Sequence, residues 1–266
     1  MGASAHRSRL LTAAVGLPLL ALCIWQGGWF LFALVLAASL AGLWECLGLF
    51  PGAGMCLRGL TLALGAAMVW LGWRFGPAAA LAVPLAAFWL EEFARLAHAP
   101  LRDPAGSAGP PRWLLAASLL YVPGSLQFLT AFTPGETALV IAVVMATDTG
   151  AYYAGHAIGG PKIWPSVSPK KTWAGSFGGL AATLVVCLAV GALWGQASLW
   201  AFAALGLCMS VASQMGDFME SSLKRTADIK DSGNLLPGHG GILDRVDGLL
   251  PAILVYALAR TMAHYL

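Results

Sequence analysis

The residues best suited to chemistry are concentrated in one segment, 216–247. It carries six of the twelve acidic residues in a chain otherwise dominated by Leu, Ala and Gly. If the part before residue 225 is helical, four polar residues share one stripe of that helix: Asp217, Glu220, Ser221 and Lys224. Asp244 and Asp247 are again three residues apart, where a new apolar run begins. Carboxylates beside Lys and Arg at the edge of an apolar span favour a site where a hard divalent cation holds phosphate.

Asp148 lies well inside another apolar run. Burying an unpaired carboxylate in such a run costs several kcal/mol of free energy. We therefore expect Asp148 to face the protein interior, with a cation, a water pocket or a hydroxyl partner. A functional role and a structural hydrogen bond to Thr147 or Thr149 are both open at this point.

The loop 159–179 adds a third polar segment. Its Ser168-Pro169 pair predicts the start of a helix, because serine caps a helix and proline fits the first turn. Backbone amides there, next to Lys170, Lys171 and Thr172, would form an anion site. The alternative is that the two lysines serve only as a topology signal at a membrane surface.

The elements that must position these residues are membrane helices. Hydrophobic residues make up 59% of the chain and charged residues 10%, and the mean hydropathy is +0.76. Soluble domains carry about 25% charged residues. The sequence predicts an all-α polytopic integral membrane protein with about nine spans: 10–26, 28–50, 57–73, 77–97, 113–132, 136–156, 174–194, 198–217 and 248–264.

The charges predict an orientation for these spans. With the N-terminus in the cytoplasm, all Lys and Arg residues except Arg74 and Arg260 fall on the cytoplasmic side, as the positive-inside rule requires. All three polar segments then share that side. The net charge of +3 describes a basic face at an anionic lipid surface, and it makes nucleic acid an improbable partner.

The chain divides into a four-span N-terminal part (1–98), a cytoplasmic linker rich in Pro and Gly (99–112) and a five-span catalytic part (113–266). The N-terminal part is poor in candidate chemistry. Its Glu91 and Glu92 have Arg95 within one helical turn, which predicts a helix-end ion pair. Glu45, in the second span, has no partner nearby in the sequence and stays unassigned.

The polar segments together resemble a known family. The run from Ser221 to Asp247, which includes Lys230-Asp231-x-Gly233 and Leu236-Pro237-x-His239-Gly240-Gly241, is similar to the signature of the phosphatidate cytidylyltransferases, also called CDP-diacylglycerol synthases. The blocks 148–150 and 168–173 resemble two further motifs of that family. The close match covers about residues 145–255.

The resemblance implies that CTP and phosphatidate react to give CDP-diacylglycerol and pyrophosphate. It also implies Mg2+, room for a second cation such as K+, an active site on the cytoplasmic side of the cell inner (plasma) membrane, and a homodimer. The metal ligands it implies are Asp217 and Asp244, with Asp247 and Glu220 beside them. The other catalytic candidates are Lys224, Arg225, Lys230, Asp231, His239 and Arg245. The candidates for substrate binding are Lys170, Lys171, Thr172, Ser221, Gly240, Gly241 and Asp148.

Two other functions are compatible with parts of the pattern. A CTP-dependent polyprenol or dolichol kinase would transfer the γ-phosphoryl group to an alcohol and would use similar basic motifs. A cation-coupled transporter would use Asp148 and Glu45 as intramembrane ion sites, but it would leave the segment rich in Lys and Arg unexplained.

Overall fold

The computed structural model describes residues 3–50, 52–89, 113–235 and 240–266 of the chain. Within these ranges the regular elements are helices, and the only β pairing is an isolated bridge between Lys162 and Thr172. The prediction of an all-α protein is therefore confirmed. The linker 99–112, the acids Glu91 and Glu92, and His239 lie outside the described residues.

Six helical stretches among the described residues are long and apolar enough to cross a membrane. Three shorter apolar helices, Ala14–Gln26, Pro77–Trp89 and Leu249–Met262, fall on the first, fourth and ninth predicted spans. The protein is thus an all-α membrane protein. The six long stretches are Gly28–Gly48, Met55–Phe75, Leu114–Ala131, Pro134–Ala157, Trp173–Trp194 and Leu199–Thr226.

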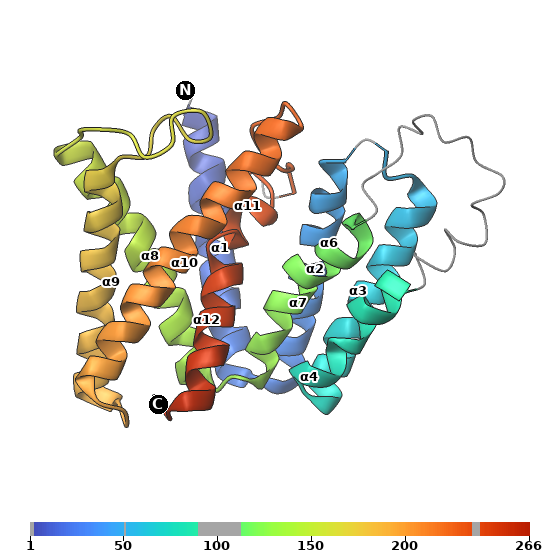
Figure 1. Ribbon diagram of the computed structural model, residues 1–266, viewed down its shortest axis with the longest axis horizontal. Helices are drawn as coiled ribbons and strands as arrows, with labels where there is room; N and C mark the ends of the chain where they lie inside the picture. Colours follow the sequence, from blue (N-terminus) through green and yellow to red (C-terminus); the bar gives the residue numbers. More distant parts are fainter. Residues whose placement is uncertain (1–2, 51, 90–112, 236–239) are drawn as a thin grey trace. The chain divides into compact units, whose positions relative to one another are not determined.

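The chain folds into two compact units. The first comprises Met1–Ala131 with Ser232–Leu243. Its α-helices, labelled in Figure 1, are α1 (Ala3–Gln26), α2 (Gly28–Gly48), α3 (Met55–Phe75), α4 (Pro77–Ala80), α6 (Leu114–Tyr121) and α7 (Pro123–Leu126). The 3-10 helix η2 (Gln127–Ala131) follows α7. Helices α6, α7 and η2 pack against α2 and α3. The fifth predicted span thus belongs to this unit, although the sequence grouped it with the C-terminal part.

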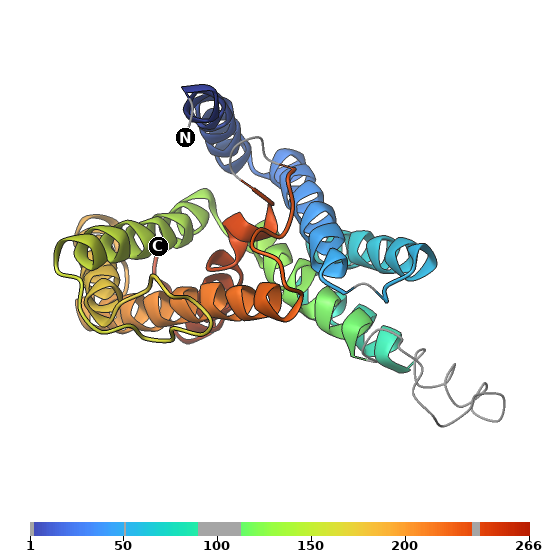
Figure 2. The same ribbon diagram turned by 90° about the horizontal axis from the view of Figure 1, so that it is seen from above.

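The second unit comprises Phe132–Asp231 with Asp244–Leu266. Its helices are α8 (Pro134–Ala157), α9 (Trp173–Trp194), α10 (Leu199–Thr226), α11 (Leu243–Val246) and α12 (Leu249–Met262). Helix α9 packs against both α8 and α10, and α10 also packs against α12 (Figure 2). Helix α8 approaches α9 closely, because a methyl group at Gly178 would overlap the Cβ of Ala154 and lie 2.9 Å from the carbonyl oxygen of Gly150.

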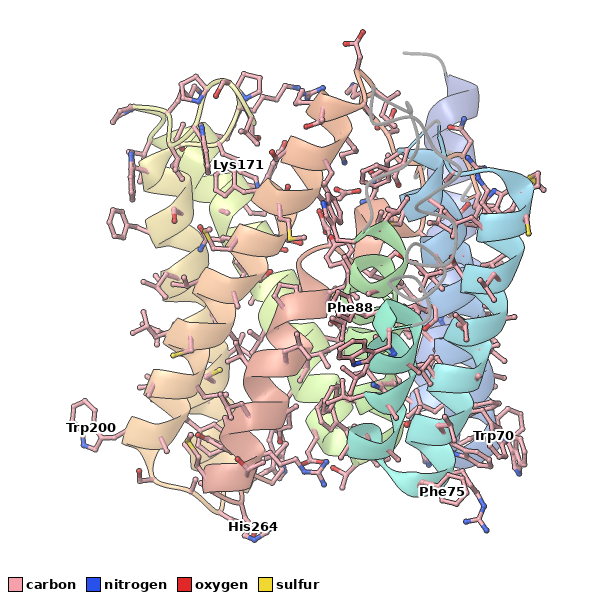
Figure 3. All side chains as sticks on the ribbon, turned by 45° about the vertical axis from the view of Figure 1, so that its right-hand side comes forward. Trp70, Phe75, Phe88, Lys171, Trp200 and His264 are labelled. Carbon is pink, nitrogen blue, oxygen red and sulfur yellow. The ribbon has the colours of Figure 1, made fainter. Side chains whose placement is uncertain are left out.

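One end of the second unit is fixed by a buried acid. Glu136 and Thr133 form a capping box at the start of α8. Tyr256 donates a hydrogen bond to Glu136 Oε1 at 3.2 Å, and Arg260 Nε lies 3.2 Å from the same oxygen. These contacts hold α12 against α8. Trp200 and His264 lie at this end of the unit, whereas Lys171 lies at the opposite end (Figure 3).

Two boundaries differ from the sequence predictions. Helix α10 continues to Thr226, beyond the predicted end at 217, so the polar stripe that starts at Asp217 is helical as expected. Helix α9 begins at Trp173 with Thr172 as its N-cap, so the predicted start at Ser168-Pro169 is wrong. The backbone of Thr172 is extended and pairs with Lys162, and residues 165–170 form turns. Thr172 is therefore the residue whose hydroxyl caps the first turn.

Candidate functional site

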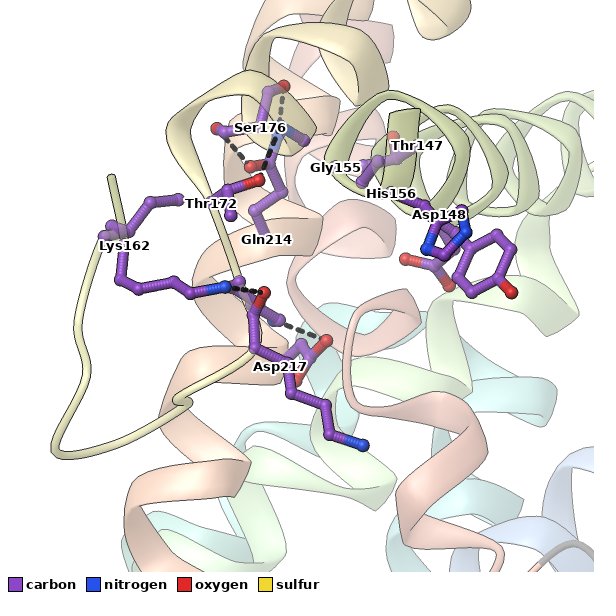
Figure 4. A pocket seen from close by; sticks show the side chains of 15 residues that line it. Thr147, Asp148, Gly155, His156, Lys162, Thr172, Ser176, Gln214 and Asp217 are labelled. Carbon is purple, nitrogen blue, oxygen red and sulfur yellow. Dashed lines mark hydrogen bonds and ion pairs between the residues drawn. The ribbon is translucent and has the colours of Figure 1, made fainter. Parts of the chain in front are cut away.

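A pocket of about 490 Å³ lies in the second unit, at the end of α8, α9 and α10 that carries the loop 158–172 (Figure 4). Three lysines of the loop line it, Lys162, Lys170 and Lys171, together with Asp148 and Asp217 from the helices. The pocket thus combines cationic and acidic groups at one end of membrane helices. Asp148 lines this pocket, and its side chain is exposed there rather than buried.

The central contact of the pocket joins the loop to α10. Lys171 Nζ lies 2.5 Å from Asp217 Oδ2, and about a third of each side chain remains exposed. The same ammonium lies 4.3 Å from the centre of the Phe218 ring, where the ring face adds attraction for a cation. Lys171 is thus held in position and is still accessible to an anionic group.

Hydrogen bonds of backbone and side-chain groups order the loop. Thr172 Oγ1 accepts from Gly175 N at 3.1 Å, and Trp173 N donates to the carbonyl of Pro161 at 3.1 Å. Lys162 Nζ donates to the carbonyl of Lys170 at 3.3 Å. Two of the first amides of α9 are thus already used, and the lysine side chains are the cationic groups that line the pocket.

Below the pocket a polar chain crosses the three helices. Ser176 of α9 donates to Gln214 Oε1 at 2.5 Å, and Gln214 Nε2 donates to Ser210 Oγ at 3.3 Å. Thr147 of α8 donates to Ser210 Oγ at 3.3 Å and lies 2.7 Å from Thr183 Oγ1. These bonds satisfy polar groups that would be costly in an apolar span, and they fix the helices that carry Asp148 and Asp217.

A second ionic cluster joins α10 to α11. Lys224 Nζ lies 2.7 Å from Glu220 Oε2 and 2.7 Å from Asp244 Oδ1. Glu220 is 1% exposed, and its other oxygen is buried without a hydrogen-bond partner among the described residues. Ser221 Oγ donates to Asp217 Oδ1 at 3.3 Å on the same stripe of α10. The predicted stripe is thus confirmed as a row of interacting side chains.

Asp247 belongs to the same group of acids. It lies between α11 and α12, and its Oδ1 accepts from Gly248 N at 2.7 Å. Burial, and after it the nearby charge of Asp217, raises the pKa of Asp247 to about 6. The two carboxylates therefore influence each other, although they come from different helical segments.

These acids are the candidates for holding Mg2+. No group of three or more His, Cys, Asp or Glu side chains in the described part of the chain already forms a metal site. The chemistry of the donors fits, however. Asp217, Glu220, Asp244 and Asp247 supply the carboxylate oxygens that hard cations prefer, and Glu220 keeps one buried oxygen unpaired among the described residues. In this structure the ammonium groups of Lys171 and Lys224 occupy positions beside these carboxylates.

The remaining candidates lie at the surface or in the first unit. Arg225, Lys230, Asp231 and Arg245 are exposed, and Arg225 Nη1 donates to the carbonyl of Ile229 at 3.3 Å. Gly240, with φ of 84°, and the buried Gly241 belong to the segment 232–243 of the first unit.

Sequence reasoning left one residue without a role. Glu45 of α2 is 3% exposed, and its Oε2 accepts from Leu243 N at 2.8 Å and from Ser232 Oγ at 3.3 Å. All three residues belong to the first unit. The available signal was an acid inside an apolar span, but its partners lie nearly two hundred residues away.

Comparison with known proteins gives consistent matches. A family model described as the cytidylyltransferase family matches residues 7–263. A phosphatidate cytidylyltransferase of Brucella suis is 50% identical over 131 residues, so the match spans about half of each protein, 48% of this chain and 48% of the relative. One from Mycobacterium bovis is 30% identical over 244 residues, 86% of this chain and 80% of the relative. One from Bacillus subtilis is 46% identical over 109 residues, 41% of this chain and 40% of the relative.

Proposed function

We propose, because the chain belongs to the cytidylyltransferase family, that it is a phosphatidate cytidylyltransferase. It would transfer CMP from CTP to phosphatidate and release pyrophosphate, with CDP-diacylglycerol as the lipid product. One observation above all supports this activity. Lys171 and Asp217 are paired in a pocket lined by two further lysines, at one end of membrane helices.

The reaction needs no nucleophile from the protein. A phosphate oxygen of phosphatidate attacks the α-phosphorus of CTP and forms the new P–O bond. The bond from that phosphorus to the oxygen bridging to the β-phosphate breaks, and pyrophosphate leaves with the bonding electrons. The difficulty is to bring two polyanions together, so the protein must screen their repulsion and align them.

The chain's own cations suit this task. Lys162, Lys170 and Lys171 are the pocket groups that would bind phosphate oxygens. The tails of phosphatidate would stay in the bilayer, with its headgroup at the pocket. Lys224, Arg225, Lys230 and Arg245 would provide further positive charge for CTP and for the leaving pyrophosphate.

The carboxylates would hold the cation. Asp217 and Asp244 are the proposed Mg2+ ligands, with Asp247 and Glu220 as additional or supporting ligands. When bound, Mg2+ supplies positive charge that screens the phosphates and stabilises the departing pyrophosphate. A second cation such as K+ and a homodimer are part of the same proposal.

The positive-inside bias supports an orientation. We place the pocket at the cytoplasmic face of the cell inner membrane, because the lysines that line it then lie on the side where basic residues accumulate. CTP would reach the site from the cytoplasm and phosphatidate from the inner leaflet.

The direct test uses CTP labelled at the α- or the γ-phosphate, with membranes containing the protein and with or without phosphatidate. We expect the α-label to enter the lipid only when phosphatidate is present, and the γ-label to leave as pyrophosphate. Label from the γ-position in the lipid would instead indicate a CTP-dependent lipid kinase. Absence of both labels from the lipid would refute the proposal.

A further inference from the structure

A buried carboxylate of the first unit binds both ends of the segment that leads into the acidic cluster. Ser232 and Leu243 mark the two ends of the segment 232–243, and both donate hydrogen bonds to Glu45 Oε2, at 3.3 Å and 2.8 Å. One oxygen thus joins both ends of the segment. The next residue in the chain is Asp244, which pairs with Lys224.

The surroundings of Glu45 are shaped for this contact. A methyl group at Gly233 would overlap Glu45 Oε1, and one at Gly241 would overlap Ser232 Oγ and lie 2.5 Å from Glu45 Oε2. Only a residue without a side chain lets the backbone come this close. The two glycines therefore leave room for the carboxylate between the two arms of the segment.

The position of Glu45 in its helix does not explain why an acid is present. Glu45 is in the last turn of α2, which ends at Gly48. The helix dipole disfavours a negative group at that end, and burial adds a further cost. The hydrogen bonds to Leu243 and Ser232 are the compensation that the structure provides.

We propose that Glu45 is a positioning residue for the proposed reaction: its carboxylate is a clamp that holds Ser232 and Leu243, and Leu243 is the residue that directly precedes Asp244 in the chain. This inference rests on the proposed function, because Asp244 matters as a candidate metal ligand. Glu45 touches neither substrate nor cation in this account, and it acts through the backbone of Leu243.

An amide cannot replace the carboxylate fully. Both donors point to Oε2, so a glutamine must keep its oxygen there and place its NH2 group at the position of Oε1. That position is buried and has no hydrogen-bond partner among the described residues. An unsatisfied buried donor weakens the clamp.

The matched control is Glu136, a second deeply buried acid that binds a backbone amide. Glu136 is 5% exposed, and its Oε2 accepts from Thr133 N at 2.7 Å. It lies in the second unit, at the end that carries His264 rather than Lys171. Glu136→Gln makes the same chemical change without touching the segment 232–243.

The experiment compares the full-length wild type, Glu45→Gln and Glu136→Gln in detergent by amide hydrogen exchange without substrates. We expect Glu45→Gln to speed exchange in peptides covering 241–243 about tenfold. Glu136→Gln should leave those peptides unchanged and should speed exchange near Thr133. If the amides of 241–243 exchange as slowly in Glu45→Gln as in the wild type, the proposal is wrong.

Activity provides the second readout. Loss of folded enzyme only scales the maximal rate, whereas a displaced Asp244 weakens cation binding. We expect the Mg2+ concentration for half-maximal CMP transfer to rise about tenfold in Glu45→Gln and to stay at the wild-type value in Glu136→Gln. If Glu45→Gln needs the same Mg2+ concentration as the wild type for half-maximal CMP transfer, Glu45 has only a structural role and the positioning proposal is wrong.

A second variant and a second comparison separate failure of this proposal from failure to fold and from failure of the proposed function. If Glu45→Gln does not fold, Gly233→Ala tests the same clamp, because its methyl group displaces the carboxylate while Glu45 remains. Gly233→Ala should reproduce the faster exchange, and wild-type exchange in it would count against the clamp. If the wild type transfers no α-label to lipid, the proposed function fails, while the exchange measurement still decides whether Glu45 holds the segment.

Discussion

Lys224 Nζ lies 2.7 Å from Asp244 Oδ1, which links α10 to the start of α11 across twenty positions of the chain. The same ammonium lies 2.7 Å from Glu220 Oε2. One lysine therefore pairs with two buried or nearly buried acids that come from different segments. In the proposed enzyme it also sets how close Asp244 lies to the carboxylates of α10.

Removing this lysine should destabilise the protein strongly. Lys224→Met leaves Glu220 and Asp244 without their cation, and loss of one partner of a buried ion pair costs about 3–5 kcal/mol. Thermal unfolding in detergent should show a clear fall in the midpoint. The double variant Lys224→Met with Glu220→Gln should recover part of the loss.

The control for this prediction is Lys162→Met. Lys162 is exposed and donates only to a backbone carbonyl, so its replacement should change stability by no more than about 0.5 kcal/mol. If Lys162→Met and Lys224→Met lower the unfolding midpoint equally, the number of positive charges, rather than the contacts of Lys224, controls stability.

Asp217 and Asp228 are a matched pair of aspartates for testing the cation site. Asp217→Asn removes a proposed Mg2+ ligand and the partner of Lys171, so CMP transfer should fall by about two orders of magnitude or more. Asp228 is exposed and follows α10 with φ of 54°, a conformation that asparagine also tolerates. Asp228→Asn should keep wild-type activity in the same membrane assay. Near-normal transfer by Asp217→Asn at ordinary Mg2+ would exclude Asp217 as a ligand.

The start of α9 gives a prediction about stability. Thr172→Ala removes the hydroxyl that accepts from Gly175 N, which should cost about 1 kcal/mol. Thr172→Ser keeps that hydroxyl and should lie close to the wild type. Chemical or thermal unfolding of the purified protein measures both, and equal stability of the Ala and Ser variants would contradict the cap.

The close approach of α8 and α9 can be tested at one glycine. Gly178→Ala would force its methyl group against Ala154, so the two helices must separate, and a loss of about 1–3 kcal/mol is expected from overpacking. Gly59 in α3 is the control, because nothing lies within 4 Å of a methyl group there. Gly59→Ala should be neutral or stabilising, since alanine favours a helix over glycine. Thermal midpoints of the two variants should therefore move apart.

Local chemistry alone was enough to predict much of this protein. In lipid only helices and closed β-barrels satisfy the backbone, and apolar runs of about 20 residues indicate helices, so the sequence predicted the all-α membrane class. The spacing of Asp217, Glu220, Ser221 and Lys224 predicted one face of a helix, because helical periodicity is a short-range property. Thr172 and Gly240 could be singled out by motif, but no spacing rule could say what they touch.

The tertiary structure decided which polar groups meet. Lys171 pairs with Asp217 across forty-six positions, and Glu45 binds Leu243 across nearly two hundred. The start of α9 at Trp173 also depended on a contact within the preceding loop, since Thr172 pairs with Lys162 and caps the helix. The sequence by itself determined what each segment is, because periodicity and burial act locally. Only folding determined its partners, because contacts between segments far apart in the chain depend on how whole helices pack.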